Sequence, residues 1–261
     1  MEALTSVMEM LRDPVLYIGL GRGLLLTLEI SALSIALSFV FGTILGSMRY
    51  SGLPVISHVA TTYIEFIRNL PTLLLILVSY FVLGLPAMWA ATIGLTIYTS
   101  AIIAEIIRGG LNSVPPGQWE AARSQGFNFI QAMRHVVLPP SVVKMIPAIV
   151  SQFVTVIKDS SFAMAIGAYE LMFKGTILAA KYWKPAQIIT IYVVIALVYF
   201  VINFAISMVA RRLQNATRGC DTVARLGGDE FGILVEHMDA RAGAETVAER
   251  IVTALREPIS L

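Results

Sequence analysis

The 261-residue sequence has little charge and almost no cysteine. Charged residues make up 14% of the chain, whereas soluble domains carry about 25%. Cys220 is the only cysteine, which excludes an internal disulfide and leaves the redox compartment open. The three histidines lack metal-ligand spacing, and the apolar part holds no nucleophile with a matching base. A phosphate-binding loop of the G-x-x-x-x-G-K-[ST] type is also missing, so we expect no ATP site of that kind in this chain.

What the sequence does have is long apolar runs. No residue between Asn69 and Ala104 is charged, and as one helix this run would be about 54 Å long at ~1.5 Å per residue. Because the hydrocarbon core of a bilayer is only ~30 Å thick, the run must fold back, and Gly84-Leu85-Pro86 is the predicted break. The same argument predicts an all-α integral membrane protein rather than a soluble one with buried helices. The five expected spans are roughly 22–48, 62–84, 87–109, 141–166 and 185–210.

Basic residues predict the orientation of these spans. With the N-terminus outside, seven basic residues collect on the cytoplasmic side and five on the outer side, as the positive-inside rule favours. The seven are Arg49, Arg108, Arg123, Arg134, Lys144, Arg211 and Arg212, and the five are Arg12, Arg22, Lys174, Lys181 and Lys184. The opening MEALTSVMEM has no basic n-region, so we expect no cleaved signal peptide. Five spans then place the C-terminus in the cytoplasm.

The segment QWEAARSQGFNFIQAMRHVVLPP, residues 118–140, lies between the third and fourth spans and is therefore predicted to be cytoplasmic. Its pattern predicts two short helices joined at Gly126, with Glu120 and two alanines forming a compact contact surface on the first. We expect Pro139 and Pro140 to end the second helix before the chain re-enters the membrane. Such a hairpin is typical of a partner-docking element; the alternative is an amphipathic helix lying on the lipid surface.

The spacing within this segment resembles the EAA loop of ATP-binding-cassette (ABC) importer permeases. Glu120-Ala121-Ala122 is followed after three residues by Gly126 and after nine more by Val136-Val137-Leu138-Pro139, where the family has Ile-x-Leu-Pro. Three further stretches resemble the polar amino-acid subfamily in the family's order: YIEFIRNLPTLL (63–74), YTSAIIAEIIRGGLNSVPPGQWEAARSQGF (98–127) and VIKDSSFAMAIGAYEL (156–171). The resemblance covers about residues 15–213 and implies the five-span fold of a type I importer permease over residues 1–213.

The resemblance also implies a function and a set of partners. A permease of this family carries no ATPase site, so ATP and Mg²⁺ would bind to separate cytoplasmic ABC ATPase subunits, and this chain would need no cofactor. A second permease subunit, identical or homologous, would complete the pathway in the bacterial inner membrane. An extracytoplasmic binding protein would deliver a polar amino acid, with glutamine favoured, and no nucleic acid is involved.

Within the EAA loop, the resemblance assigns the contact with the ATPase to Glu120, Ala121, Ala122 and Gly126. Residues 118–126 would then receive the movement of the ATPase. Two plainer interpretations stay open: Glu120 as a solvated charge that stabilises the loop, and Gly126 as an ordinary helix stop.

Charged residues inside the spans form a second candidate site. Lys158 and Asp159 fall near the middle of the fourth predicted span, where ionisable groups are costly and usually face a cavity or a partner. Adjacent residues on a helix point about 100° apart, so each needs a partner of its own, and Ser160 and Ser161 add hydroxyls. A zwitterionic amino acid needs both charge signs, which favours a substrate pathway. The alternative is an ion pair that ties this span to the second or third.

Two acid–base pairs near the cytoplasmic ends of the second and third spans are the remaining candidates. Glu65 and Arg68 are three residues apart, as are Glu105 and Arg108, which places each pair on one helix face. A gate or interface role is one interpretation, and a local pair that reaches the membrane surface is the other.

The tail has a different character. Up to Leu213 the chain holds fourteen basic and nine acidic residues (14 − 9 = +5), and the remainder holds five basic and eight acidic (5 − 8 = −3). ARLGGDEF (224–231) resembles the signature of GGDEF diguanylate cyclase domains, and residues 244–261 resemble the segment on the C-terminal side of that signature. The resemblance implies a small α/β fragment over residues 214–261, with a hairpin turn at 227–230, a helix at 242–256, and Glu230 as a metal ligand in a complete domain.

The first half of such a domain would have to precede the hairpin, where this chain has a membrane span. We therefore expect a fragment that binds no metal and has no cyclase activity. Two alternatives to a plain transporter subunit stay open, namely a membrane-anchored cyclic di-GMP signalling protein and a transporter regulated through its tail. The amino acid transported and the origin of the tail are also left open.

Overall fold

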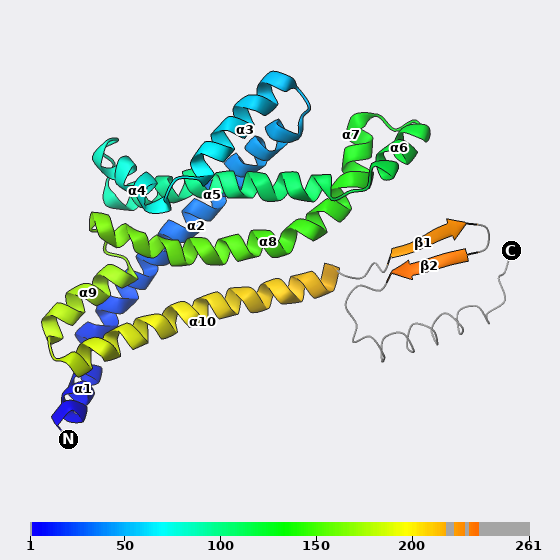
Figure 1. The fold of residues 1–261 in the computed structure, drawn as a ribbon. Helices are drawn as coiled ribbons and strands as arrows, with labels where there is room; N and C mark the ends of the chain where they lie inside the picture. Colours follow the sequence, from blue (N-terminus) through cyan, green and yellow to red (C-terminus); the bar gives the residue numbers. More distant parts are fainter. Residues whose placement is uncertain (1, 218–221, 228–229, 235–261) are drawn as a thin grey trace, which may run out of the picture. The chain divides into compact units, whose positions relative to one another are not determined.

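The computed structural model describes residues 2–217, 222–227 and 230–234 (Figure 1). The chain divides into two compact units, Met1–Gln214 and Asn215–Leu261. The first unit is helical throughout its described part. Its helices in chain order are α1 (Glu2–Arg12), α2 (Pro14–Tyr50), α3 (Pro54–Arg68), α4 (Thr72–Phe81), α5 (Ala87–Asn112), α6 (Pro116–Ser124), α7 (Phe129–Ala132), the π-helix η1 (Met133–Val137), α8 (Leu138–Asp159), the 3₁₀-helix η2 (Ser160–Ile166), α9 (Leu171–Tyr182) and α10 (Pro185–Thr217).

Four helical stretches of the described chain are long and apolar enough to cross a membrane, and a bent pair makes a fifth. The four are Pro14–Tyr50, Ala87–Asn112, Phe129–Ile166 and Pro185–Met208. The predicted class, an all-α membrane protein with five spans, is confirmed. The predicted break before α5 is confirmed as well, because Gly84 adopts a positive φ of 66° between α4 and α5.

The second span is not the single helix predicted over 62–84. It consists of α3 and α4, whose axes differ by 97°. Pro71 causes the break, since it has no N–H and disfavours helical geometry in the residue before it. The Asn69 amide donates to the carbonyl of Glu65 at 2.7 Å and satisfies the last turn of α3. After the bend, α4 lies against α5, where a Cβ on Gly94 would approach the backbone nitrogen of Ile76 to 2.8 Å.

A stripe of small residues on α2 sets the packing of the bundle. Gly42 lies so close to α5 that a Cβ there would meet the Ile103 side chain at 2.7 Å, and Ser34 donates to the carbonyl of Thr92 at 3.2 Å. Because lipid tails are as apolar as leucine, close backbone approach and hydrogen bonds rather than hydrophobicity drive helix association in a membrane. The buried small residues of α2 recur every three or four positions: Gly23, Thr27, Ser31, Ser34, Ser38, Gly42 and Gly46.

The other end of the same stripe contacts the start of α9. Thr27 accepts the N–H of Leu171 at 3.0 Å, and a Cβ on Gly23 would meet the Leu171 Cα at 2.9 Å. Glu170 is fully buried and, as the N-cap of α9, accepts the N–H groups of Met172 and Phe173, while Tyr199 of α10 donates to it at 3.3 Å. This carboxylate therefore joins α9 to α10 within the unit.

The second helix of the segment 118–140 does not stop at Pro139 and Pro140 as predicted. The chain runs from α7 through η1 into α8 without a break, and the stretch Phe129–Ile166 counts as one span. In η1 the turn is widened, and the N–H of Leu138 bonds to the carbonyl of Met133, five residues back. A wider turn moves the preceding carbonyls away from the proline rings, which otherwise clash with the carbonyl four residues earlier. The prediction was wrong because it assumed α-helical geometry.

In the second unit, residues 222–227 and 230–234 form an antiparallel hairpin of β1 (Thr222–Gly227) and β2 (Glu230–Leu234). The two strands flank the predicted turn, and the register is irregular between Arg225 and Gly227. Residues 228–229 of that turn and the predicted helix over 242–256 lie outside the described residues.

Candidate functional site

The first predicted site lies on α6 and the turn that ends it. Glu120 and Ala121 are exposed, whereas Ala122 is buried against the chain itself. Gly126 has a φ of 82°, its N–H bonds to the carbonyl of Arg123, and the next residue's N–H bonds back to the carbonyl of Ala122. This is the Schellman arrangement, in which a left-handed residue closes a helix. Gly126 is thus a helix stop whose conformation L-residues resist.

The inner side of α6 borders a cavity of about 390 Å³. Glu120 and Arg123 line it on α6, and Tyr50 at the end of α2 lines it from the bundle. Trp119 also lines it and stacks on Phe129 of α7, with ring centroids 5.5 Å apart. The aromatic stack fixes α6 relative to α7, and the cavity leaves space between α6 and the end of the bundle.

The second predicted site lies where α8 ends. Lys158 and Asp159 are the last two residues of α8 before the 3₁₀-helix η2, rather than the middle of a continuous helix. The Ser160 and Ser161 hydroxyls each donate at 2.7 Å to a carbonyl three residues earlier in the chain. Both hydroxyl protons are therefore used locally.

Lys158 is exposed and borders a cavity of about 380 Å³ with residues of α10. Three polar side chains of α10 share this cavity: Tyr199, Asn203 and Ser207. Asn203 has a buried Oδ1 that lacks a hydrogen-bond partner among the described residues. In the described part of the chain neither Lys158 nor Asp159 forms an ion pair, so the predicted tie to the second or third span is not observed.

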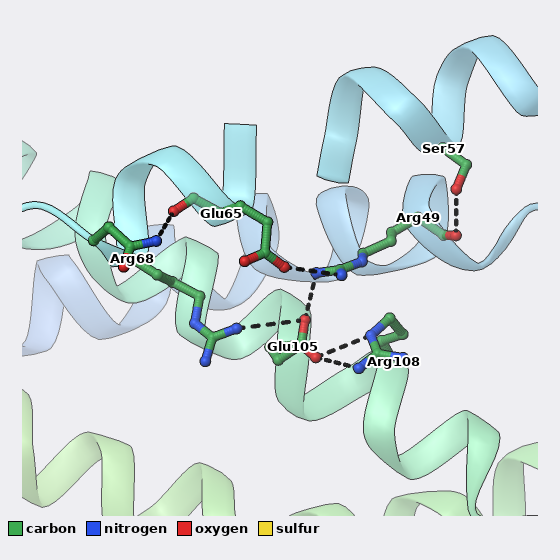
Figure 2. Close-up of polar contacts among 7 residues, drawn as sticks. Arg49, Ser57, Glu65, Arg68, Glu105 and Arg108 are labelled. Carbon is green, nitrogen blue, oxygen red and sulfur yellow. Dashed lines mark hydrogen bonds and ion pairs between the residues drawn. The ribbon is translucent and has the colours of Figure 1, made fainter. Parts of the chain in front are cut away.

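The third site is an ion cluster that joins α2, α3 and α5 (Figure 2). Arg49, at the end of α2, donates to Glu65 of α3 at 3.1 Å and to Glu105 of α5 at 2.6 Å. Arg108 donates through Nε to Glu105 at 3.0 Å, and Arg68 lies 3.8 Å from the same carboxylate. The side chains of Arg49 and Glu105 are only 15% and 22% exposed, so this pair is screened less than a surface ion pair.

The ion cluster agrees with the spacing argument for one pair only. Glu105 and Arg108 form the expected local pair, but Glu65 bonds to Arg49 instead of Arg68. Sequence reasoning missed Arg49 because its partners lie 16 and 56 positions away. The available signal was its place at the end of an apolar run, with two acidic residues near the ends of the neighbouring spans.

No group of three or more potential metal ligands from histidine, cysteine, aspartate and glutamate occurs among the described residues. Glu230 is described only as the first residue of β2.

Comparison with protein families finds two matches. Residues 38–219 match the family described as binding-protein-dependent transport system inner membrane component. Residues 203–261 match the GGDEF domain of diguanylate cyclases.

Individual proteins resemble the first of these regions. The probable glutamine ABC transporter permease protein GlnP of Bacillus subtilis is 41% identical over 200 residues, covering 75% of this chain and 92% of the relative. The probable glutamine ABC transporter permease protein GlnM of the same organism is 38% identical over 195 residues, covering 72% and 88%.

Among solved structures, the crystal structure of an amino acid ABC transporter with histidines superposes with a TM-score of 0.73 at 32% identity. The match covers 80% of this chain and 98% of that one. With the five spans and the EAA spacing already on α6 to α8, these matches leave one assignment: the chain belongs to the family of inner membrane components of binding-protein-dependent transport systems.

Proposed function

We propose that the chain is a permease subunit of an ATP-driven ABC importer that moves a polar amino acid, with glutamine favoured, across the bacterial inner membrane. The names of the relatives support the substrate class. The observation that carries the proposal is the coupling segment, residues 118–139. It presents Glu120 and Ala121 on an exposed helix and closes that helix with a left-handed Gly126. Within this segment Ala122 packs inward and supports the exposed face.

The energy would enter from outside this chain. Cytoplasmic ABC ATPase subunits that bind ATP and Mg²⁺ would contact the coupling segment, and an extracytoplasmic binding protein would deliver the amino acid at the opposite end. A second permease subunit, identical or homologous, would complete the pathway. This arrangement requires the predicted topology, with the N-terminus outside and the C-terminus in the cytoplasm.

The continuous helix from α7 to α8 supplies a physical link between the coupling segment and the pathway. A capping box at Asn128 begins α7, with Asn128 and Gln131 each accepting the other's N–H. The helix then runs without interruption to Asp159. A displacement of α6 would pass to α7 through the Gly126 turn and the Trp119–Phe129 stack, and from α7 it would reach Lys158 along one continuous helix.

We assign the substrate pathway to Lys158, Asp159, Ser160 and Ser161. The support is the cavity beside Lys158, which is largely apolar and is also bordered by Tyr199 and Ser207 of α10, so that the lysine supplies its one cation. The lysine complements the carboxylate of an amino acid. Since the serine hydroxyls donate to the backbone, we assign them the role of shaping the end of α8 and accepting hydrogen bonds.

We assign the ion cluster of Arg49, Glu65, Arg68, Glu105 and Arg108 an interface role within the chain. Its contacts join three helices at the end where Tyr50 borders α6. A gate would instead require the cluster to open during transport.

For the tail, we propose a partial GGDEF-like fragment over residues 214–261, following the permease domain 1–213, that is not an enzyme. The first half of such a domain would have to precede β1, where this chain has α10, so a part of the core is replaced by a membrane span. Glu230 supplies one carboxylate, whereas a two-metal nucleotide site needs further ligands.

The first prediction concerns Gly126. Gly126→Val forces a β-branched residue to φ 82°, at about 1–2 kcal/mol, which displaces the end of α6. We expect amino acid taken up per ATP hydrolysed to fall roughly tenfold, the equivalent of that energy, while membrane insertion stays intact. Uptake and ATP hydrolysis are measured in proteoliposomes. Gly117→Ala, on the same helix with open space around it, is the control, and equal coupling in both variants would reject the assignment.

The second prediction concerns Lys158. Lys158→Met removes a charged hydrogen-bonding group worth about 1.5–3 kcal/mol, so we expect uptake to fall by roughly one to two orders of magnitude at normal abundance of the assembled complex. Lys144→Met removes a lysine from the same helix but outside the cavity and should leave uptake near normal. Loss of the assembled complex in place of uptake would support a structural role, and wild-type values for both would reject either role.

The third prediction concerns the ion cluster. Arg49→Gln removes contacts to two carboxylates and should destabilise the purified permease by about 1–3 kcal/mol, between the limits for exposed and buried pairs. Arg68→Gln loses a single contact at 3.8 Å and should cost less than about 1 kcal/mol. Thermal unfolding in nanodiscs gives both values. An interface role predicts that uptake falls only with the folded fraction; a substrate leak through stable protein would indicate a gate.

The fourth prediction concerns the tail. Truncation after Leu213 should leave amino acid uptake unchanged, and the full chain should convert no GTP to cyclic di-GMP. Both are measured on purified full-length and truncated chains side by side. Cyclic di-GMP formed by the full chain and lost on truncation would overturn this proposal, and a change in uptake alone would favour regulation through the tail.

A further inference from the structure

Helix α1 precedes the first span and is too short to cross a membrane itself. One of its faces packs on the bundle, where Met10 is 2% exposed and belongs to a core cluster with Leu16 and Ile191. On the same face Ser6 is buried, and the Gln187 amide of α10 donates to its carbonyl at 2.9 Å. This contact fixes which side of α1 faces the protein.

The rest of the α1 surface divides into two faces of opposite character. Leu4, Met8 and Leu11 are spaced by four and three residues and therefore form one stripe. Their side chains are 68%, 49% and 36% exposed, so the chain leaves the stripe uncovered. Glu9 and Arg12 are exposed about 100° further round the helix. The helix thus has a protein-packed face, an open apolar face and a charged face.

A polar clasp holds α1 in this position. Asp13, between α1 and α2, accepts hydrogen bonds from Tyr182 at 2.5 Å and from Lys181 at 2.9 Å, both at the end of α9. These bonds, led by that from Tyr182, lower the pKa of Asp13 from 3.8 to about 2. The contribution of the clasp to stability is present above the ordinary pKa and is lost only as the pH falls through about 2. At neutral pH the clasp stays intact.

The first span also begins with exposed apolar side chains. Val15 and Ile18 lie at the start of α2, beyond the extended residue Asp13, and are 50% and 54% exposed. They belong to the surface of α2, which crosses the membrane. In Figure 1, α1 lies at the end of the helical unit that holds α9, and α6 and α7 lie at the other end. The stripe therefore borders the lipid-facing surface at the end away from the coupling segment.

We propose that α1 is an interfacial helix that binds the lipid surface of the leaflet at this end of the protein. The hydrocarbon boundary contacts Leu4, Met8 and Leu11, and Glu9 and Arg12 face the headgroups and water, as in amphipathic helices that lie in the plane of a membrane. A second copy of the chain fits the stripe less well. A standard protein interface buries about 800 Å² on each partner, more than one narrow stripe between charged residues provides.

The experiment uses spin labels, because the chain has a single cysteine. Cys220→Ser leaves no thiol, and Met8→Cys and Glu9→Cys then place a nitroxide on adjacent residues, one on the apolar face and one on the charged face. The full chain is reconstituted in nanodiscs of phosphatidylethanolamine and phosphatidylglycerol. Collision rates with oxygen, which partitions into lipid, and with a water-soluble nickel chelate are measured by power saturation. We expect the oxygen-to-nickel ratio at residue 8 to exceed that at residue 9 severalfold.

Two results would overturn the proposal. High nickel accessibility at both residues would place α1 in water, and low accessibility to both reagents at residue 8 would show that protein, such as a second copy, covers the stripe. Leu4→Cys, on the same stripe, repeats the measurement if the Met8 variant folds poorly. Amino acid uptake by each labelled variant verifies its fold.

Discussion

The close contact between α2 and α5 is the constraint on which the other features depend. Glycines, serines and a threonine on one face of α2 let the backbones meet, and larger side chains at Gly42 or Gly46 would collide with α5. At one end this contact brings Arg49 within reach of Glu105 and places Tyr50 beside α6. At the other end the same stripe receives α9. The coupling end and the opposite end are therefore positioned by one helix.

The ion cluster and the small-residue stripe act in different ways. Close packing is short-ranged and directionless along the stripe, so by itself it tolerates sliding of one helix on another by a turn. An arginine bound to two carboxylates on two other helices tolerates no such slide, because both hydrogen bonds would be lost together. Packing holds α2 and α5 together, and the cluster sets their register with α3. The end of the bundle that α6 borders is therefore held in one arrangement of α2, α3 and α5.

Much of this organisation could be predicted from the sequence, and the exceptions have physical causes. The long apolar runs predict the spans, Gly84-Leu85-Pro86 predicts the break before α5, and the residue pattern of 118–140 predicts the two helices joined at Gly126. Hydropathy carries no information on the direction of a helix axis. It could therefore not distinguish a straight second span from one bent at Pro71. The i, i+3 spacing argument identifies partners within one helix only. It therefore could not identify Arg49, whose partners lie on two other helices. The substitution of a π turn for a proline stop depends on backbone geometry that residue preferences do not encode.

That π turn fixes an angle as well as a path. A π turn holds one residue more than an α turn, and each residue of a helix advances the direction of the side chains by about 100°. The number of residues between Phe129 and Lys158 therefore sets the rotational phase between α7 and the lysine that lines the cavity beside α10. Relaxing the wide turn to α geometry would turn one end against the other without breaking the helix. The residue spacing from α7 to α8 therefore fixes the direction in which side chains point at the two ends of this helix, as well as the distance between them.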